Sequence, residues 1–461
     1  MSPYPFHIKE HVVPSQHVRE WPRATANSQE DVLYVSVKQY IPVDNPSPQP
    51  GDITIIAAHA NGFPKELYQP LWADLHALSS ISNSESKPDS GPKGKGAGGF
   101  RIRGIWIADV SNQGYSGMLN EQSQGNDPSW DDHARDLLHL TNVFRTEMPR
   151  PLIGIGHSFG AAILTKLSLL HPRLLTSLVL LDPVITSFSF KPSGPGQSPA
   201  RASSFRRETW PDRDAAAASF RRSPLYGAWD PRVLDAWIAH GIRPAPTLLF
   251  PSPNPTDDKA TLRTPKHQEV FTYFRPLWPH LRESPATTAA GEALALTVDK
   301  DGAPDFDPQM ADGALARDMV FPFYRSEGAS LLKHLPEVRP SVLWVFGGDS
   351  DLGAPAGRKL KTETCGIGGG GSGGLKAGRV AQVVMEGRGH LFPMEVPNEC
   401  ARHAAAWIAK EMNRWRAGER EYVEWTKLPL KEKTTLSETF LGNIGRPARR
   451  NKSLVGTESK L

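Results

Sequence analysis

The chain has 461 residues, of which 39% are hydrophobic, and a formal net charge of +4. This length and apolar content allow a core larger than most single domains contain, so we expect one enlarged domain or a domain with a cap. The small charge, with no basic stripe interleaved with aromatic residues, argues against nucleic-acid binding, and no apolar run approaches the roughly eighteen residues of a membrane span.

The first hundred residues contain the first strand patterns. Residues 1–30 carry little pattern beyond a short apolar alternation and are interpreted as an N-terminal extension. Residues 31–41 alternate with period two and predict a strand, and residues 52–58 predict the next one. Residues 79–99, rich in Ser, Lys, Gly and Pro, are typical of a mobile low-complexity insertion, and residues 100–108 predict a third strand.

The most informative stretch is Pro151–His171, which follows a helical pattern over residues 130–144. An apolar run predicts a buried strand, and a segment rich in Ala and Leu predicts a helix. Between them lies Gly-His-Ser-Phe-Gly. In a nucleophile elbow the serine has a strained backbone, so the residues two before and two after it must be very small. Gly156 and Gly160 meet this demand, which predicts that Ser158 is a catalytic nucleophile.

A second match to the same pattern serves as a control. Gly370–Gly374 also places a serine between glycines, but it lies in a glycine run, residues 366–374, with no strand before it and no helix after it. We interpret this run as a flexible loop insertion without a catalytic serine.

The sheet pattern stops after residues 176–181, a predicted strand that ends at Asp182-Pro183. Helical stretches follow at residues 213–222 and 231–240. A largely helical insertion at this point of a sheet protein is interpreted as a cap over the site, residues 186–335. Its aromatic side chains are candidate pocket walls: Trp210, Trp229, Trp237, Phe271, Tyr273, Phe274, Phe321, Phe323 and Tyr324.

The sheet pattern returns at residues 341–346 and 380–385, and a closing amphipathic helix is predicted at residues 401–415. The first of these strands leads into a turn with two acids, and the second leads into a glycine-containing loop. The predicted domains are an α/β core (residues 31–185 and 336–425), the cap between its two parts, and a polar tail (residues 426–461).

Three predicted strand ends carry a nucleophile, an acid and a histidine, in that chain order. Ser158 comes first, and His390 is preferred among the fifteen histidines because it follows a strand on a glycine-containing loop. An imidazole must take the serine proton during attack, and a carboxylate must hold that imidazole in the right tautomer. Asp351 is the preferred acid, with Asp349 as the first alternative and Asp182, at the end of the strand before the cap, as the second.

Two backbone amides are predicted to form an oxyanion hole. The strand at residues 52–58 ends in the turn His59–Pro64, on the N-terminal side of the nucleophile strand, where such a donor is needed. The expected donors are the N–H groups of Phe63 and of Phe159, the residue after the nucleophile.

The last three residues, Ser459, Lys460 and Leu461, match the peroxisomal address that an import receptor reads at a free C-terminus. The polar residues before them predict a disordered, accessible tail. The N-terminus lacks the apolar core of a secretory signal, and two cysteines, Cys365 and Cys400, are too few for a disulfide framework. We therefore predict a peroxisomal location, with the import receptor as a partner.

These motifs together resemble the α/β-hydrolase superfamily: the serine elbow, the turn with two acids, and Gly-His-Leu-Phe-Pro around His390, in matches spread over residues 50–185 and 340–415. The resemblance implies a mostly parallel central sheet flanked by helices, with a helical cap insertion.

A narrower resemblance is carried by Ala58–Glu66, by Thr264–Glu269 in the cap and by the terminal tripeptide. These segments resemble fungal peroxisomal hydrolases, a group that includes the AK-toxin biosynthesis hydrolase and the yeast peroxisomal lipase. One departure is that the usual His-Gly before the oxyanion donor is Asn61-Gly62 here. Membership would imply hydrolysis of an ester, lipid or acyl thioester in peroxisomal lipid or secondary-metabolite (toxin) metabolism.

The leading hypothesis is a serine hydrolase that acts on a small-molecule acyl ester or thioester. Serine at the elbow disfavours epoxide-hydrolase and dehalogenase chemistry, which needs a carboxylate nucleophile. An acyltransferase with the same triad is one alternative, because it differs only in the acceptor that resolves the acyl-enzyme, and a non-catalytic binding protein of this fold is another. No metal-ligand spacing occurs, so no metal or cofactor is expected.

Overall fold

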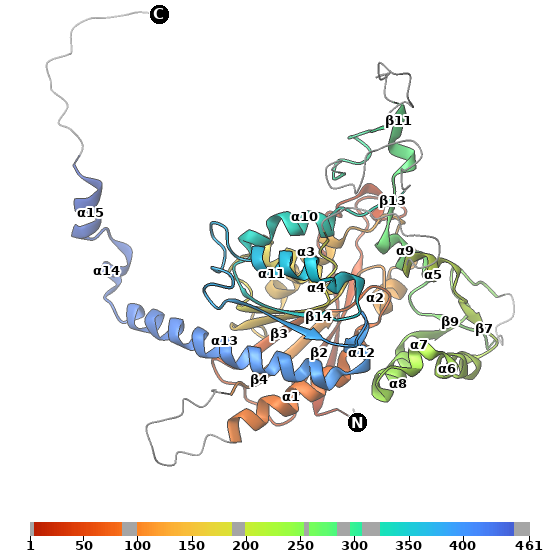
Figure 1. The fold of residues 1–461 in the computed structure, drawn as a ribbon, viewed down its shortest axis with the longest axis horizontal. Coiled ribbons are helices and arrows are strands. Elements are labelled where there is room, and N and C mark those ends of the chain that lie inside the picture. The colour runs from red at the N-terminus through yellow and green to blue at the C-terminus, as the bar shows by residue number, and fades with distance from the viewer. Residues whose placement is uncertain are drawn as a thin grey trace, which may run out of the picture. The chain divides into compact units, whose positions relative to one another are not determined.

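The computed structural model describes residues 4–84, 99–186, 199–252, 258–283, 296–306 and 323–446. The chain forms two compact units, residues 1–412 and 413–461, and the first of them contains the central sheet (Figure 1).

Eight strands form this sheet, in the order β1-β2-β4-β3-β5-β6-β14-β15. Strands β1 and β2 pair antiparallel, β2 pairs antiparallel with β4, and the remaining pairs are parallel. Every residue of β3, β5, β6 and β14 is buried, which suits parallel strands covered by helices on both faces. The strands are β1 (Phe6–Pro14), β2 (Tyr34–Pro42), β3 (Ile53–Ala58), β4 (Ile102–Ala108), β5 (Leu152–His157), β6 (Ser177–Leu181), β14 (Ser341–Gly347) and β15 (Val380–Met385).

The prediction that residues 1–30 form an N-terminal extension is wrong at Phe6–Pro14, because these residues form strand β1 of the sheet. This strand pairs along its whole length with β2, from Phe6 opposite Pro42 to Pro14 opposite Tyr34. The short apolar alternation was the signal of an edge strand, and it was too weak to be separated from an irregular segment.

Helices cover both faces of the sheet (Figure 1). On one face lie α3, α4, α10 and α11, and on the other lie α1 and the first part of α13, whose Trp407 Nε1 donates to Ser177 Oγ of β6 at 2.8 Å. Their bounds, with those of two short helices near the site, are α1 (Gln69–Ser84), α2 (Gly114–Leu119), α3 (Trp130–Val143), α4 (Phe159–Leu170), α10 (Glu327–His334), α11 (Pro355–Thr364), α12 (Phe392–Glu395) and α13 (Pro397–Thr426).

The insertion after β6 contains the two predicted helices at their predicted residues, as α6 and α8, but also short strands. Strands of two or three residues carry no detectable period, which is why the sequence pattern missed them. The elements are α5 (Pro199–Phe205), β7 (Thr209–Trp210), α6 (Arg213–Arg222), α7 (Pro224–Gly227), α8 (Pro231–His240), β8 (Ile242–Pro244), β9 (Ala260–Leu262), α9 (Lys266–Tyr273), β10 (Arg275–Pro276), β11 (Leu281–Glu283), β12 (Leu296–Val298) and β13 (Phe323–Tyr324).

The last residues of the predicted cap, which form α10 (Glu327–His334), belong to the core instead. Helix α10 packs against α4, and its Leu331 is part of the main hydrophobic cluster. Gly328 allows α10 to lie close to the segment after β6, since a Cβ there would lie 2.9 Å from the carbonyl oxygen of Val184.

The two predicted insertions differ in outcome. The glycine run at residues 366–374 is a turn rather than an elbow, and it is held by hydrogen bonds from Gly366 N to Leu335 O (2.9 Å) and from Ser372 N to Val338 O (3.1 Å). The insertion predicted for residues 79–99 begins inside α1, and its residues 85–98 lie outside the described part of the chain.

The predicted polar tail contains α14 (Leu430–Thr434) and α15 (Glu438–Ile444). The terminal tripeptide and the polar stretch that precedes it, residues 447–461, lie outside the described residues. None of the helices in the described ranges combines the length and apolarity that a membrane crossing requires.

Candidate active site

The turn between β5 and α4 has the geometry of a nucleophile elbow. Ser158 adopts φ +58° and ψ −118° immediately before α4. A Cβ on Gly156 would lie 2.7 Å from the carbonyl oxygen of Gly160, and a Cβ on Gly160 would lie 2.3 Å from that of Ala58. Both positions therefore exclude any side chain, which is the physical reason for the two glycines in the sequence pattern.

Ser158, His390 and Asp182 form one hydrogen-bonded series at the carboxyl ends of β5, β15 and β6. The distance from His390 Nε2 to Ser158 Oγ is 2.8 Å, and that from His390 Nδ1 to Asp182 Oδ2 is 2.6 Å. Because an ionised carboxylate only accepts hydrogen bonds, Nδ1 carries the hydrogen and Nε2 accepts the serine hydroxyl. The imidazole is thus oriented to take the serine proton.

Asp182 is held in the form that this series needs. Burial alone would raise its pKa, but hydrogen bonds from His390, from the Ser350 hydroxyl (2.5 Å) and from Gly347 N–H (3.1 Å) outweigh burial and lower the pKa. The carboxyl group is therefore ionised at neutral pH.

Backbone strain also marks these positions. Within the described ranges, the non-glycine residues with positive φ are Ser158 and Asp182, the latter at +42°. Such conformations cost roughly 1–3 kcal/mol each and cluster at functional sites, because the surrounding structure must enforce them. Two neighbouring strand ends therefore hold strained residues that meet at one histidine.

The preferred acid, Asp351, is wrong as the partner of His390. Asp351 and the first alternative, Asp349, are both exposed, and the hydrogen bond to His390 comes from Asp182, the second alternative. The turn after β14 contributes Ser350 to the carboxylate instead of contributing the carboxylate itself. The position of Asp182 at the end of the strand before the cap was the only sequence signal for it.

The residues of the series differ in exposure. Ser158 is 5% exposed, whereas the His390 side chain is 34% exposed. Ser158 is thus shielded from solvent, while the His390 imidazole is partly accessible.

The turn Ala60–Phe63, called the oxyanion turn after its predicted role, follows β3, and the two predicted donors, Phe63 and Phe159, differ in availability. Phe159 N–H is the first amide of α4, and amides of a first helical turn have no partner within their helix. Phe63 N–H donates to Ala60 O at 3.2 Å, across Gly62 at φ +80°. The Phe63 amide is therefore engaged within the turn in this structure.

A cap helix lies directly on the oxyanion turn. Asn61 Nδ2 donates to the carbonyl oxygen of Glu269 in α9 at 3.0 Å, and a Cβ on Gly62 would lie 2.7 Å from the Glu269 carboxyl carbon. Gln113 joins the two parts, since it accepts from Gly62 N–H (2.7 Å) and donates to Asn61 Oδ1 (2.7 Å) and Thr272 Oγ1 (3.0 Å). Asn61, at the departure from the family pattern, thus docks the cap.

Aromatic side chains of the cap pack on the same turn. The Phe63 ring lies 5.4 Å from the Trp229 ring and 6.1 Å from the Trp237 ring, centroid to centroid, and both contacts are edge-on. Asp230 N–H donates to Met394 O at 2.9 Å, which ties this cluster to α12, just after His390. Two of the predicted aromatic walls therefore border the oxyanion turn.

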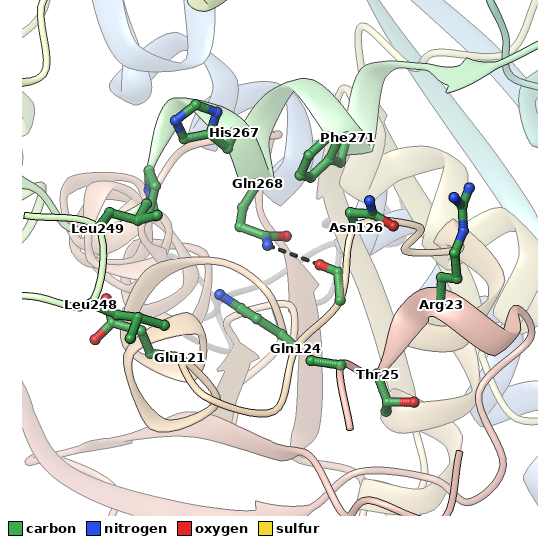
Figure 2. A pocket seen from close by; sticks show the side chains of 13 residues that line it. Arg23, Thr25, Glu121, Gln124, Asn126, Leu248, Leu249, His267, Gln268 and Phe271 are labelled. Atoms are coloured by element: carbon green, nitrogen blue, oxygen red, sulfur yellow. Dashed lines mark hydrogen bonds between the residues drawn. The ribbon is translucent and has the colours of Figure 1, made fainter. Parts of the chain in front are cut away.

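A cavity of about 570 Å³ lies on another side of α9 (Figure 2). It contains none of the three residues of the series, and Phe271 is the member of the predicted aromatic set that lines it; Phe321 of that set lies outside the described residues. In Figure 2, Gln268 Nε2 donates to Gly125 O, at 3.0 Å. The lining residues are Arg23, Thr25, Ala26, Glu121, Gln124, Gly125, Asn126, Leu248, Leu249, Pro265, His267, Gln268 and Phe271.

Metal ligands and thiols are further groups that could support chemistry in the described ranges. No cluster of three His, Cys, Asp or Glu side chains gathers there as metal ligands. Cys365 and Cys400 are free and buried, and burial raises the pKa of Cys365 to about 12, so its thiol is not a nucleophile at neutral pH.

Curated relatives match the chain over most of its length. The type I acyl-CoA thioesterase mpaH′ of Penicillium brevicompactum is 40% identical over 440 residues, which cover 92% of this chain and 92% of that protein. The abhydrolase domain-containing protein AFT2-1 of Alternaria alternata is 30% identical over 270 residues, 57% of this chain and 85% of its own.

Among solved structures, the peroxisomal alpha-beta-hydrolase Lpx1 of Saccharomyces cerevisiae has the same fold, with a TM-score of 0.61, 14% identity, and coverage of 94% of this chain and 99% of that one. The alpha/beta hydrolase family matches residues 96–403, which include the elbow, Asp182 and His390. The chain therefore belongs to the alpha/beta hydrolase family.

Proposed function

We propose that this protein is a serine hydrolase that cleaves acyl-CoA thioesters, with Ser158 as nucleophile, His390 as general base and Asp182 as the acid of the triad. The observation that supports the roles most directly is the hydrogen-bonded series from Ser158 through His390 to Asp182. The thioester is favoured by the relatives that span 92% of the chain, which are named type I acyl-CoA thioesterases.

In the first half of the reaction, Ser158 Oγ attacks the thioester carbonyl carbon while its proton passes to His390 Nε2. Asp182 stabilises the imidazolium that forms. The developing oxyanion accepts hydrogen bonds from Phe159 N–H and, when its turn bond to Ala60 opens, from Phe63 N–H. The carbon–sulfur bond then breaks, and the CoA thiolate takes the proton from His390.

In the second half, water replaces the thiol. His390 Nε2 takes a proton from the water molecule as its oxygen attacks the acyl-enzyme carbonyl carbon. The bond to Ser158 Oγ breaks, and Oγ receives the proton back. The net reaction consumes one thioester and one water and yields one carboxylic acid and free CoA.

A substrate panel tests this proposal. We expect the purified full-length protein to release thiol from acyl-CoAs, with one mole of free acid for each mole of thiol, and to act less efficiently on p-nitrophenyl esters of the same acyl chains. Thiol release without free acid would instead indicate acyl transfer to another acceptor. If the serine reacts with a fluorophosphonate but the protein releases thiol from no acyl-CoA, the proposed thioesterase activity is excluded.

We also propose that the protein works in the peroxisome, because its last residues, Ser459, Lys460 and Leu461, match a receptor-read peroxisomal address. A fluorescent protein fused to the N-terminus of the full chain is expected to give punctate fluorescence that overlaps a peroxisomal marker. Deletion of the tripeptide is expected to leave the fusion diffuse, and punctate fluorescence of the truncated fusion would contradict the proposal. The same deletion is expected to leave hydrolysis in vitro unchanged.

A further inference from the structure

His157, the residue before Ser158, is fully buried and hydrogen-bonded at both ring nitrogens. Its Nε2 lies 3.1 Å from the backbone carbonyl oxygen of His390, and its Nδ1 lies 2.9 Å from the hydroxyl oxygen of Tyr68. The rings of His157 and His390 also lie beside each other, with 5.2 Å between their centroids. One side chain next to the nucleophile thus contacts the loop that carries the base.

The partners of His157 determine where its proton lies. A carbonyl oxygen can only accept, so Nε2 carries the hydrogen and donates it to His390, and Nδ1 accepts the Tyr68 hydroxyl. Burial and, after it, the charge of the neighbouring His390 lower the pKa of His157 to about 3, so the ring is neutral at neutral pH. A neutral ring with one hydrogen satisfies both contacts at once.

Tyr68 continues the series to the oxyanion turn. Its hydroxyl oxygen accepts Ala60 N–H at 2.8 Å. The Ala60 carbonyl accepts Phe63 N–H at 3.2 Å and the Nδ1 hydrogen of His59 at 2.8 Å. His59 is oriented for this, because its Nε2 accepts Val110 N–H at 3.0 Å. Both backbone groups of Ala60 are held, so the placement of the turn depends on Tyr68 and, through it, on His157.

We propose that His157 is a positioning residue that fixes the oxyanion turn and the His390 loop relative to Ser158. This role rests on the proposed hydrolytic function, since it concerns the placement of the oxyanion turn, the His390 loop and Ser158 for that reaction. The contacts are buried, so a lost partner leaves an unsatisfied polar group rather than one that water can satisfy. A displacement of about 1 Å among reacting groups costs about 100-fold in rate.

Two variants of His157 separate positioning from packing. His157→Leu removes both hydrogen bonds, whereas His157→Gln offers an amide N–H to the His390 carbonyl and an amide oxygen to the Tyr68 hydroxyl. With the best acyl-CoA of the panel, we expect His157→Leu to lower kcat about 10- to 100-fold with KM within about twofold. If His157→Leu lowers kcat about 100-fold, the kcat of His157→Gln is expected to be at least tenfold higher than that of His157→Leu.

The second arm of the experiment removes the Tyr68 hydroxyl. Tyr68→Phe is expected to lower kcat at least fivefold in the wild-type background and to have a clearly smaller effect in His157→Leu, because both changes break one series. Tyr40→Phe is the matched control: Tyr40 is also fully buried, but its hydroxyl accepts from Gln69 at 3.2 Å, away from Ser158 and His390. This control is expected to keep kcat within about twofold.

Wild-type kcat in His157→Leu, or an equal effect of Tyr68→Phe in both backgrounds, would overturn the proposal. Where His157→Leu does not fold, Tyr68→Phe decides alone, and a kcat equal to that of Tyr40→Phe overturns it. Failure of the thioesterase function has a different signature, because wild-type protein then releases no thiol. The rate of Ser158 labelling by a fluorophosphonate would then replace turnover, with the same expected order of variants.

Discussion

Replacing Ser158 by alanine is expected to lower acyl-CoA turnover by about 10⁴- to 10⁶-fold, because no other group can form the acyl-enzyme. Alanine keeps the Cβ that the elbow already accommodates, so the fold is expected to persist. The first measurement is labelling of both proteins with a fluorophosphonate probe, which reports an activated serine without knowledge of the substrate. Labelling is expected in the wild type and absent in Ser158→Ala.

The chain contains a matched control for this variant. Ser372 also lies in a Gly-x-Ser-x-Gly sequence, but its backbone N–H bonds to Val338 O in a turn rather than at a strand end. Ser372→Ala is expected to keep labelling and turnover at wild-type levels. Labelling that survives in Ser158→Ala and disappears in Ser372→Ala would refute the assignment of the nucleophile.

Glycine at the same position provides an independent check on strain. Glycine adopts the φ of +58° without the steric cost that alanine incurs. Ser158→Gly is therefore expected to be as inactive as Ser158→Ala but to unfold at a higher temperature. Equal or lower stability of the glycine variant would argue that the elbow is not strained.

Features that depend on local constraints could be predicted from the sequence. The elbow was recognisable because Gly156 and Gly160 are each required by atoms within a few residues or in the adjacent strand. The helices at residues 213–222 and 231–240 were predicted at their observed bounds from their helical pattern, and in the structure each begins after a polar N-cap, Asp212 or Asp230, that accepts from the first turn. The buried strands of the core could also be predicted from their apolar runs.

The identity of the acid could not be predicted, because it depends on how two strand ends meet. Strands β6 and β14 are neighbours in the sheet, so Asp182 and the turn after β14 arrive at the same place. Sequence alone does not tell which carboxylate points to the histidine. The chain uses Asp182 and places Ser350, the residue before Asp351, against it.

The contacts of Gln113 and His157 were missed for a similar reason. Gln113 is hydrogen-bonded to Gly62, 51 positions away in the sequence, and His157 is hydrogen-bonded to the His390 carbonyl, 233 positions away. Neither residue has a local pattern that sets it apart, since a polar residue in a turn and the second residue of an elbow are unremarkable in sequence. Their roles follow only from the packing of the cap and of the His390 loop.

The largest effect outside the nucleophile is expected from Asp182→Asn. Asparagine keeps the shape of the side chain and tolerates the φ of +42°, so the fold is expected to persist. An amide cannot stabilise the imidazolium, and it competes for the wrong tautomer of His390. Loss of the corresponding carboxylate in a serine protease lowers kcat by about 10⁴, and we expect a fall of about 10³- to 10⁴-fold here, with little change in KM.

Asp351→Asn is the decisive comparison, because it tests the acid that sequence reasoning preferred. Asp351 is exposed, and surface substitutions of this kind change free energies by about 0.5 kcal/mol or less, so kcat is expected to stay within about twofold. Activity lost in Asp351→Asn and kept in Asp182→Asn would reverse the assignment. The expected order, in which one buried acid matters and one exposed acid does not, follows from the hydrogen bonds that Ser350 and Gly347 donate to Asp182 alone.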